Sequence, residues 1–145
     1  MTLSDAPIRP KWARIVASIL LVTVIGGAVF LIWSMVRAGT EQPNYTMSII
    51  TLTLAATIFL TMQIRVVAKP RAKGLYVRNL VAKHEIPWEE IISVRFSADR
   101  PWAQLDVLYG EPVNVMAIQS ADGAYAQEQA ERLAAWVRTG EAREP

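Results

Sequence analysis

The chain has 145 residues, of which 52% are hydrophobic, and a formal net charge of +2. This length leaves room for one small domain with appendages, and the high apolar fraction is typical of a membrane protein. Cysteine is absent, which excludes disulfides, thiolate chemistry and cysteine metal sites formed by this chain alone.

Residues 15–36 and 42–64 form two stretches without a charged side chain. About 20 helical residues cross the ~30 Å hydrocarbon core of a bilayer, so each stretch is long enough to span it. We predict transmembrane helices at 15–36 and 45–67, joined by an external loop at 37–44. A signal peptide fits the first stretch less well, because signal h-regions are shorter, and a buried soluble hairpin would need a larger protein around it.

Basic residues gather on one side of the two predicted spans, whereas the loop between them carries only Arg37. The bases that flank the spans are Arg9, Lys11 and Arg14 before the first, and Arg65, Lys69, Arg71 and Lys73 after the second. Lys and Arg are retained on the cytoplasmic side of a membrane. The pattern therefore predicts a multi-pass plasma-membrane protein, with segment 1–14 and the C-terminal part in the cytoplasm.

Small and hydroxyl residues recur at helical spacing in both spans, which predicts that the helices pack as an antiparallel hairpin along these residues. They are Thr23, Gly27 and Ser34 in the first span and Thr46, Thr53, Thr57 and Thr61 in the second. Such a stripe can also line an ion path. Neither span has a charged residue in its interior, so a channel or transporter component is a weaker hypothesis.

The C-terminal part changes to short strand-like runs separated by turn residues. Pro70 is expected to end the second helix, and the domain is expected to cover 68–139, with a tail at 140–145. Strands are predicted at 74–79, 82–86, 91–96, 102–109 and 113–118. A final helix is predicted from Ser120 or Asp122. Its core-facing stripe consists of Ala126, Ala130, Leu133, Ala134 and Val137.

The runs Gly-Leu-Tyr-Val-Arg-Asn at 74–79 and Ile-Pro-Trp-Glu-Glu-Ile at 86–91 resemble the bacterial PH domains of small actinobacterial membrane proteins grouped with the low-molecular-weight protein antigens. The resemblance covers residues 73–138. It implies a membrane α-helical hairpin followed by a small α+β PH-like domain, in which a C-terminal helix plugs a curved antiparallel sheet. In that family, one or two spans precede the domain.

Residue types that could support catalysis are isolated in the sequence. Glu89 and Glu90 are adjacent on a predicted turn and point apart, and His84 is the only histidine. No nucleophile motif or glycine-rich phosphate loop is present. We therefore expect no enzyme activity, no cofactor and no metal site.

Charge divides the C-terminal part in two. Residues 65–83 hold six bases and no acid, whereas residues 84–145 hold eleven acids and five bases. Lys69, Arg71 and Lys73 are therefore expected to contact anionic phospholipid headgroups. The acidic remainder argues against a nucleic-acid partner.

The polar loop at 97–101 is flanked by an aromatic residue, so Arg95, Asp99, Arg100 and Trp102 are expected to form a protein contact. These features favour a non-enzymatic accessory or scaffold subunit of a larger plasma-membrane complex, such as respiratory or cell-envelope machinery, whose partners are other integral membrane proteins. The alternative is a membrane-anchored lipid-sensing domain. Eukaryotic PH domains bind phosphoinositides with several bases near the first hairpin loop, whereas the stretch 79–83 here offers only Lys83.

Overall fold

The computed structural model describes residues 4–140, which form two compact units. One unit, the helical hairpin, covers residues 13–64. The other, the sheet domain, combines the residues up to Trp12 with the chain from Arg65 onward. The chain therefore leaves the sheet domain, passes through the hairpin and returns to complete the same domain.

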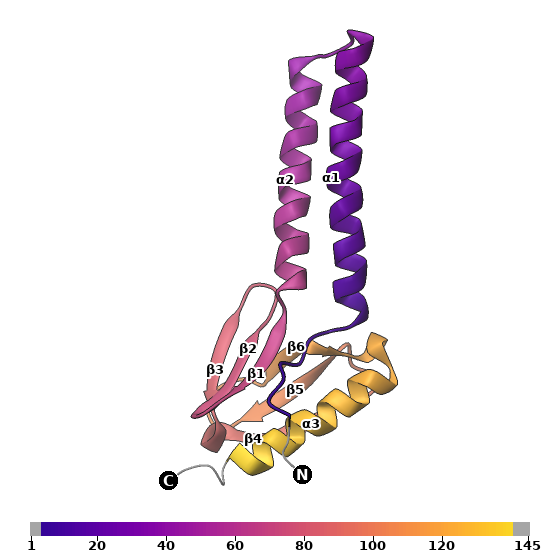
Figure 1. Ribbon diagram of the computed structural model, residues 1–145. Coiled ribbons are helices and arrows are strands. Elements are labelled where there is room, and N and C mark those ends of the chain that lie inside the picture. Colours follow the sequence, from indigo (N-terminus) through magenta and orange to yellow (C-terminus); the bar gives the residue numbers. More distant parts are fainter. Residues whose placement is uncertain (1–3, 141–145) are drawn as a thin grey trace. The chain divides into compact units, whose positions relative to one another are not determined.

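The helical hairpin consists of α1 (Trp12–Ala38) and α2 (Pro43–Ile64), which run antiparallel (Figure 1). Both helices are long and apolar enough to cross a membrane, and few of their side chains are buried. At about 1.5 Å per residue, their 27 and 22 residues are longer than the ~30 Å hydrocarbon core requires. The structure thus has two candidate spans where the sequence predicts them.

The shared face of the two helices differs in part from the predicted one. On α2, Thr46, Thr53, Thr57 and Thr61 are all partly buried, as expected. On α1, Ser34 is partly buried as expected, whereas Thr23 and Gly27 are exposed. The other less exposed positions of α1 are Ala13, Arg14, Ala17, Leu21, Val24, Ala28, Ile32 and Met35. The Thr23 hydroxyl donates to the carbonyl of Ile19 in its own helix, so it needs no partner on α2.

The sheet domain contains two three-stranded antiparallel sheets and a long helix. The first sheet has β1 (Val67–Arg71), β2 (Gly74–Arg78) and β3 (Lys83–Pro87) in that order. The 3-10 turn η1 (Trp88–Glu90) leads to the second sheet, made of β4 (Ile91–Arg95), β5 (Trp102–Val107) and β6 (Val113–Gln119). A second 3-10 turn, η2 (Ser120–Asp122), precedes α3 (Ala124–Gly140). This order agrees with the predicted PH-like fold.

The core of this domain is filled by apolar side chains from both sheets and from one face of α3. Leu75, Val77, Leu105, Val115 and Leu133 have no exposed surface. At about 25 cal/mol per Å² of buried apolar area, these contacts are the main favourable contribution to folding of the domain. The predicted stripe of α3 faces this core, although Ala134 is only half-buried.

The boundary between α2 and the first sheet differs from the prediction. The helix ends at Ile64 rather than at 67, and Pro70 lies inside β1 rather than at a helix end. Val67 and Ala68 are buried in the sheet domain, which favours an extended conformation over a further helical turn. Proline is tolerated because β1 is the first strand of its sheet. At the other end, α3 includes Gly140, and the rest of the predicted tail lies outside the described residues.

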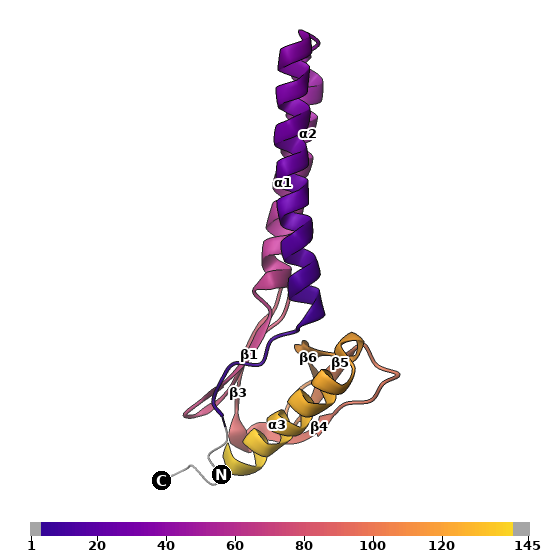
Figure 2. The ribbon, with the colours of Figure 1, turned by 45° about the vertical axis from the view of Figure 1, so that its right-hand side comes forward.

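Residues 4–11, here called the N-terminal strap, run beside β1 and α3 (Figure 2). Ile8 exchanges both backbone hydrogen bonds with Ala68, at 2.8 and 3.0 Å, and its side chain has no exposed surface. The strap therefore adds one paired residue to the edge of the first sheet. Sequence reasoning treats segment 1–14 as a simple cytoplasmic extension and misses this role.

Side chains of α3 hold the strap through its carbonyl groups. The Trp136 indole N–H donates to the carbonyl of Ser4 at 3.2 Å, and the Arg132 guanidinium donates to that of Ala6 at 2.7 Å. The Tyr125 hydroxyl donates to the carbonyl of Arg9 at 3.3 Å. These bonds replace the ladder that a full strand partner would supply, so the strap is an integral part of the domain.

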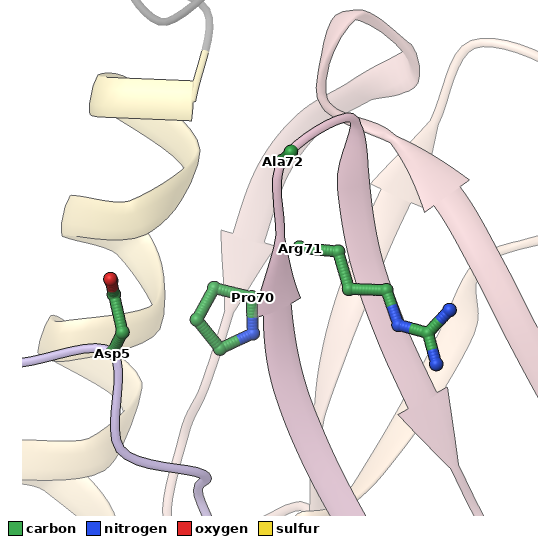
Figure 3. Close-up of a pocket in the computed structure, with 4 residues that line it drawn as sticks. All are labelled: Asp5, Pro70, Arg71 and Ala72. Atoms are coloured by element: carbon green, nitrogen blue, oxygen red, sulfur yellow. The ribbon is translucent and has the colours of Figure 1, made fainter.

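Pairing between the strap and β1 stops at Pro70, which has no backbone N–H to donate. Figure 3 shows Asp5 and Pro70 on opposite sides of the resulting hollow, with the Arg71 side chain directed away from it. The hollow has a volume of about 480 Å³. It marks the place where the strap diverges from the sheet edge.

Candidate functional site

The outer face of the β4-β5-β6 sheet carries a network of polar side chains. Strand alternation directs Ala103 and Leu105 into the core, which leaves Gln104 and Asp106 on the outer face. The Asp106 carboxylate accepts a hydrogen bond from the Ser93 hydroxyl at 2.6 Å and another from the Arg95 guanidinium. Cross-strand pairing therefore fixes this carboxylate between two donors.

A shallow hollow of about 300 Å³ lies next to this network. It is lined by Arg100, Pro101, Trp102, Gln104 and Asn114. The Arg100 guanidinium donates to the Gln104 side-chain oxygen at 2.6 Å, and the Gln104 amide donates to the Asn114 side-chain oxygen at 3.4 Å. The hollow therefore combines a cation, amides and a half-buried indole. We call these five residues with Ser93, Arg95 and Asp106 the polar face.

Two carboxylates at this end of the domain are stabilised in their charged form. The Ser93 hydrogen bond is the largest influence that lowers the pKa of Asp106, and Arg95 and Arg100 add to it. A hydrogen bond from the Ser97 side chain lowers the pKa of Asp99, with help from its own backbone and from Arg100. Both groups therefore stay ionised near neutral pH and offer fixed negative charge beside fixed positive charge.

The four residues predicted as a protein contact lie at one end of this sheet. Arg100 and Trp102 line the hollow, and Arg95 binds Asp106 in the group of polar side chains beside it. Asp99 lies exposed in the loop between β4 and β5. The prediction missed Ser93, Pro101, Gln104, Asp106 and Asn114. The alternation of β5 could have shown Gln104 and Asp106, whereas Ser93 and Asn114 needed the register of β5 with its two neighbours.

The outer face of the β1-β2-β3 sheet has a different character. The register aligns Val67, Arg78 and Lys83 in one row, and Lys69, Tyr76 and Glu85 in the next. Arg71 follows Lys69 on the same face of β1. This surface, the basic face, thus carries four bases and one acid: Lys69, Arg71, Arg78 and Lys83 against Glu85.

Arg71 is partly neutralised on the basic face. Its guanidinium lies 3.0 Å from a Glu85 carboxylate oxygen and 4.6 Å from the centre of the Tyr76 ring. Both members of the ion pair are more than half exposed, so the pair adds little stability. Lys73, the third residue of the predicted lipid contact, lies in the turn between β1 and β2. The register gathers Arg78 and Lys83 with Lys69 and Arg71, a grouping that the linear count of charges did not reveal.

The Pro-Trp-Glu-Glu run has a structural role in the domain. Trp88 is buried, and its indole N–H donates to the carbonyl of Arg71 at 3.0 Å. Glu89 and Glu90 follow it within η1, and His84 lies on β3. Among residues 4–140, no three His, Cys, Asp or Glu side chains gather closely enough to hold a metal ion.

Comparison with known proteins places these features in a family. The sequence profile of the family described as "Bacterial PH domain" matches residues 64–135. Three mycobacterial proteins, two from Mycobacterium tuberculosis strains and one from Mycobacterium bovis, are each 31% identical over 127 residues and are named as uncharacterized proteins. The aligned part covers 81% of this chain and 79% of each relative. No solved structure matches the chain at a significant level.

Proposed function

This chain belongs to the bacterial PH domain family, and from that premise we propose that it is a non-enzymatic scaffold subunit anchored in the bacterial plasma membrane. In this proposal α1 and α2 cross the membrane and both termini lie in the cytoplasm. The polar face binds another protein at the cytoplasmic surface. No catalytic group, cofactor or metal takes part in this role.

The observation that carries the proposal is the prearranged polar face. Several of its side chains already hold one another through hydrogen bonds, so a partner would have fewer side chains to order on binding. Arg and Trp side chains beside a hollow are the groups that contribute most to protein–protein binding energy. The surface is thus suited to a specific protein contact.

Integral membrane proteins of a larger assembly, such as respiratory or cell-envelope machinery, are the partners that suit an anchored subunit. Large apolar side chains cover the outside of both helices, among them Val22 and Leu52, which are 72% and 71% exposed. Such side chains can contact lipid or the helices of a neighbouring protein. The hairpin therefore offers a second docking surface at membrane depth.

Affinity purification of the intact protein in mild detergent, with mass spectrometry as readout, tests the scaffold role. We expect membrane partners in fixed stoichiometry, and a loss of at least one from the Arg100→Ala/Trp102→Ala double variant. Arg138→Ala, an exposed change on α3, is the matched control and should retain all partners. Equal recovery of the partners with the natural protein, the double variant and the control would show that the polar face does not bind them. Purification of the natural protein without any partner would contradict the scaffold role.

The orientation has a separate test. An enzyme reporter that is active only outside the cytoplasm should be active when inserted at Gly39 and inactive when fused after Pro145. This expectation follows from the flanking bases, which are retained in the cytoplasm. The reverse pattern would overturn the proposed topology.

Lipid sensing is the second candidate, because the basic face groups Lys69, Arg71, Arg78 and Lys83 on one surface. The electrostatic attraction of such bases to an anionic leaflet is about 1 kcal/mol each. Native mass spectrometry of the detergent-solubilised protein distinguishes the two roles. A partner-free protein that retains one anionic lipid species, and loses it in Lys69→Gln/Arg78→Gln, would favour lipid sensing over the scaffold.

A further inference from the structure

The hairpin tip between β2 and β3 has an unusual composition for its geometry. Asn79 and Ala82 close the loop, because the Asn79 backbone N–H donates to the Ala82 carbonyl at 2.9 Å. Turns favour Gly, Pro, Asn, Asp and Ser, yet Leu80 and Val81 occupy the centre of this four-residue loop at 79–82. Leu80 is half-buried, and Val81 is 81% exposed. Apolar residues at an exposed turn break a local preference, which points to a function.

The base of this tip is rigid. The Asn79 side-chain amide donates to the Asn114 carbonyl at 2.6 Å, and its oxygen accepts from the Met116 N–H at 3.0 Å. The Asn79 side chain thus makes two hydrogen bonds of the kind that the backbone of a neighbouring strand would make to the edge of β6. The loop is thereby fixed to the second sheet, and Leu80 and Val81 are presented on a preorganised support.

Basic residues flank the apolar tip on both strands. Arg78 ends β2, Lys83 begins β3, and the two are register partners on the basic face. An apolar tip between two cations matches the boundary between acyl chains and anionic headgroups. The two cations also argue against self-association through this tip, because they repel the same tip of a second copy.

The length of the linking chain limits how far this tip can lie from the end of α2. Only Arg65 and Val66 separate Ile64 from Val67, and Val67 is the register partner of Arg78. The three residue steps from Ile64 to Val67 span about 10 Å at full extension, and neighbouring strands lie about 4.8 Å apart. Arg78 and Lys83 are therefore tethered within a short distance of the residue where the second span ends.

We propose that the β2–β3 tip inserts Leu80 and Val81 into the interface of the bilayer that α2 crosses, while Arg78 and Lys83 bind anionic lipid headgroups. The inference rests on the proposed membrane anchoring and adds a third membrane contact, made by the sheet domain. This contact is with a lipid surface and needs no protein partner. It would restrict rotation of the domain about its short linker.

The β5–β6 tip provides an internal control. Leu108 and Tyr109 are 55% and 77% exposed there, so this tip is also apolar. Residues 107–112 include Glu111 and no base, so this tip lacks the cations that would bind anionic headgroups. Charge therefore distinguishes two hairpin tips of similar apolar character.

Single cysteines in the full-length, naturally cysteine-free chain allow a direct test. Val81→Cys and Tyr109→Cys are each labelled with a polarity-sensitive fluorophore, and the protein is placed in nanodiscs of phosphatidylcholine with or without phosphatidylglycerol. With phosphatidylglycerol, we expect the emission of the label at 81 to shift to the blue. Lipids with spin-labelled headgroups should quench the label at 81 several-fold more than the label at 109. Added Arg78→Gln/Lys83→Gln substitutions should remove most of the shift.

A third label separates failure of this inference from failure of the anchoring. Leu54 is 59% exposed in the middle of α2, so a label at Leu54→Cys should report hydrocarbon in every nanodisc. A lipid signal at 54 with equal, water-like signals at 81 and 109 would overturn the insertion of the tip alone. A water-like signal at 54 would overturn the anchoring and the tip together.

Discussion

At the scale of single residues, Trp88 and Gly140 show how closely the domain is packed. A Cβ atom added at Gly140 would lie within 2.9 Å of three atoms of the Trp88 ring. The Trp88 indole also bonds to the last residue of β1, so one side chain joins η1, the end of α3 and the first sheet. Glycine is required at 140 because the indole occupies the space of its missing side chain.

Gly140→Ala should therefore destabilise the sheet domain. Overpacking of a well-filled contact costs about 1–3 kcal/mol, because the ring and the helix end must move apart. Thermal unfolding of the full chain in detergent, followed by near-ultraviolet circular dichroism, measures the loss. Gly27→Ala is the control, since nothing lies within 4 Å of a Cβ at that position. Equal unfolding temperatures for the two variants would contradict the close packing.

The lowered pKa of Asp106 predicts that the polar face contributes to stability in a pH-dependent way. Its pKa is lowered from the ordinary value of 3.8 by the Ser93 hydrogen bond and by Arg95. A carboxyl with a lowered folded-state pKa adds stability above 3.8, and this contribution disappears as the pH falls through the folded value. Asp106→Asn should thus be less stable than the natural protein near neutral pH, and the difference should shrink in acid.

Two measurements check this expectation. Denaturant unfolding across the acidic range should show the two proteins converging as the pH falls. In an NMR titration of the Asp106 carboxyl carbon, Ser93→Ala should bring the midpoint back toward 3.8. A midpoint unaffected by Ser93→Ala would show that the hydroxyl is not the main cause.

At the scale of elements, the N-terminal strap is held from two sides. β1 supplies the backbone pair at Ala68, and α3 supplies the donors Trp136, Arg132 and Tyr125. At the C-terminal end of the strap, the Asp122 carboxylate accepts the backbone N–H groups of Lys11 and Trp12 at 2.8 and 2.9 Å. A side chain from η2 thus satisfies amides at the start of α1, where a helix has no partners of its own.

Ile8→Ala should destabilise the sheet domain although it lies before the first helix. Ile8 has no exposed surface, and shortening a buried isoleucine to alanine typically costs about 2–5 kcal/mol. Pro7→Ala changes an exposed neighbour in the same strap and should cost far less. Denaturant unfolding of both variants gives the comparison. A loss no larger for Ile8→Ala than for Pro7→Ala would mean that the strap is dispensable.

At the scale of the whole molecule, residues on either side of the two helices meet in one domain. Ile8 and Ala68 form an antiparallel pair that exchanges both hydrogen bonds, for which the Cα atoms lie about 5.5 Å apart. That spacing suits a disulfide. In the cysteine-free chain, Ile8→Cys/Ala68→Cys should form an intramolecular bridge under mild oxidation, seen as faster gel mobility. The Ile8→Cys/Tyr109→Cys pair should not, and bridging by both pairs would indicate nonspecific oxidation.

The sequence predicted those parts of the molecule whose signal is local. Two uncharged stretches indicate two spans, and the apolar stripe from Ala126 to Val137 indicates a core-facing helix. β1 was not predicted, because Val66, Val67 and Ala68 continue the apolar run of α2 and because Pro70 is a typical helix stop. The strap has no periodicity, and the α3 side chains that bind it lie more than 110 residues away along the chain. The row of Arg78 and Lys83 requires strand register, which residue types alone do not fix.

The strap also sets the order of events during synthesis. Ser4 is made 132 residues before its partner Trp136. Lys11 is likewise made 111 residues before its partner Asp122. Both helices leave the ribosome before these partners exist, so the sheet domain can close only after the hairpin has been made. Closure of the sheet domain therefore joins the segments that lie before and after the hairpin.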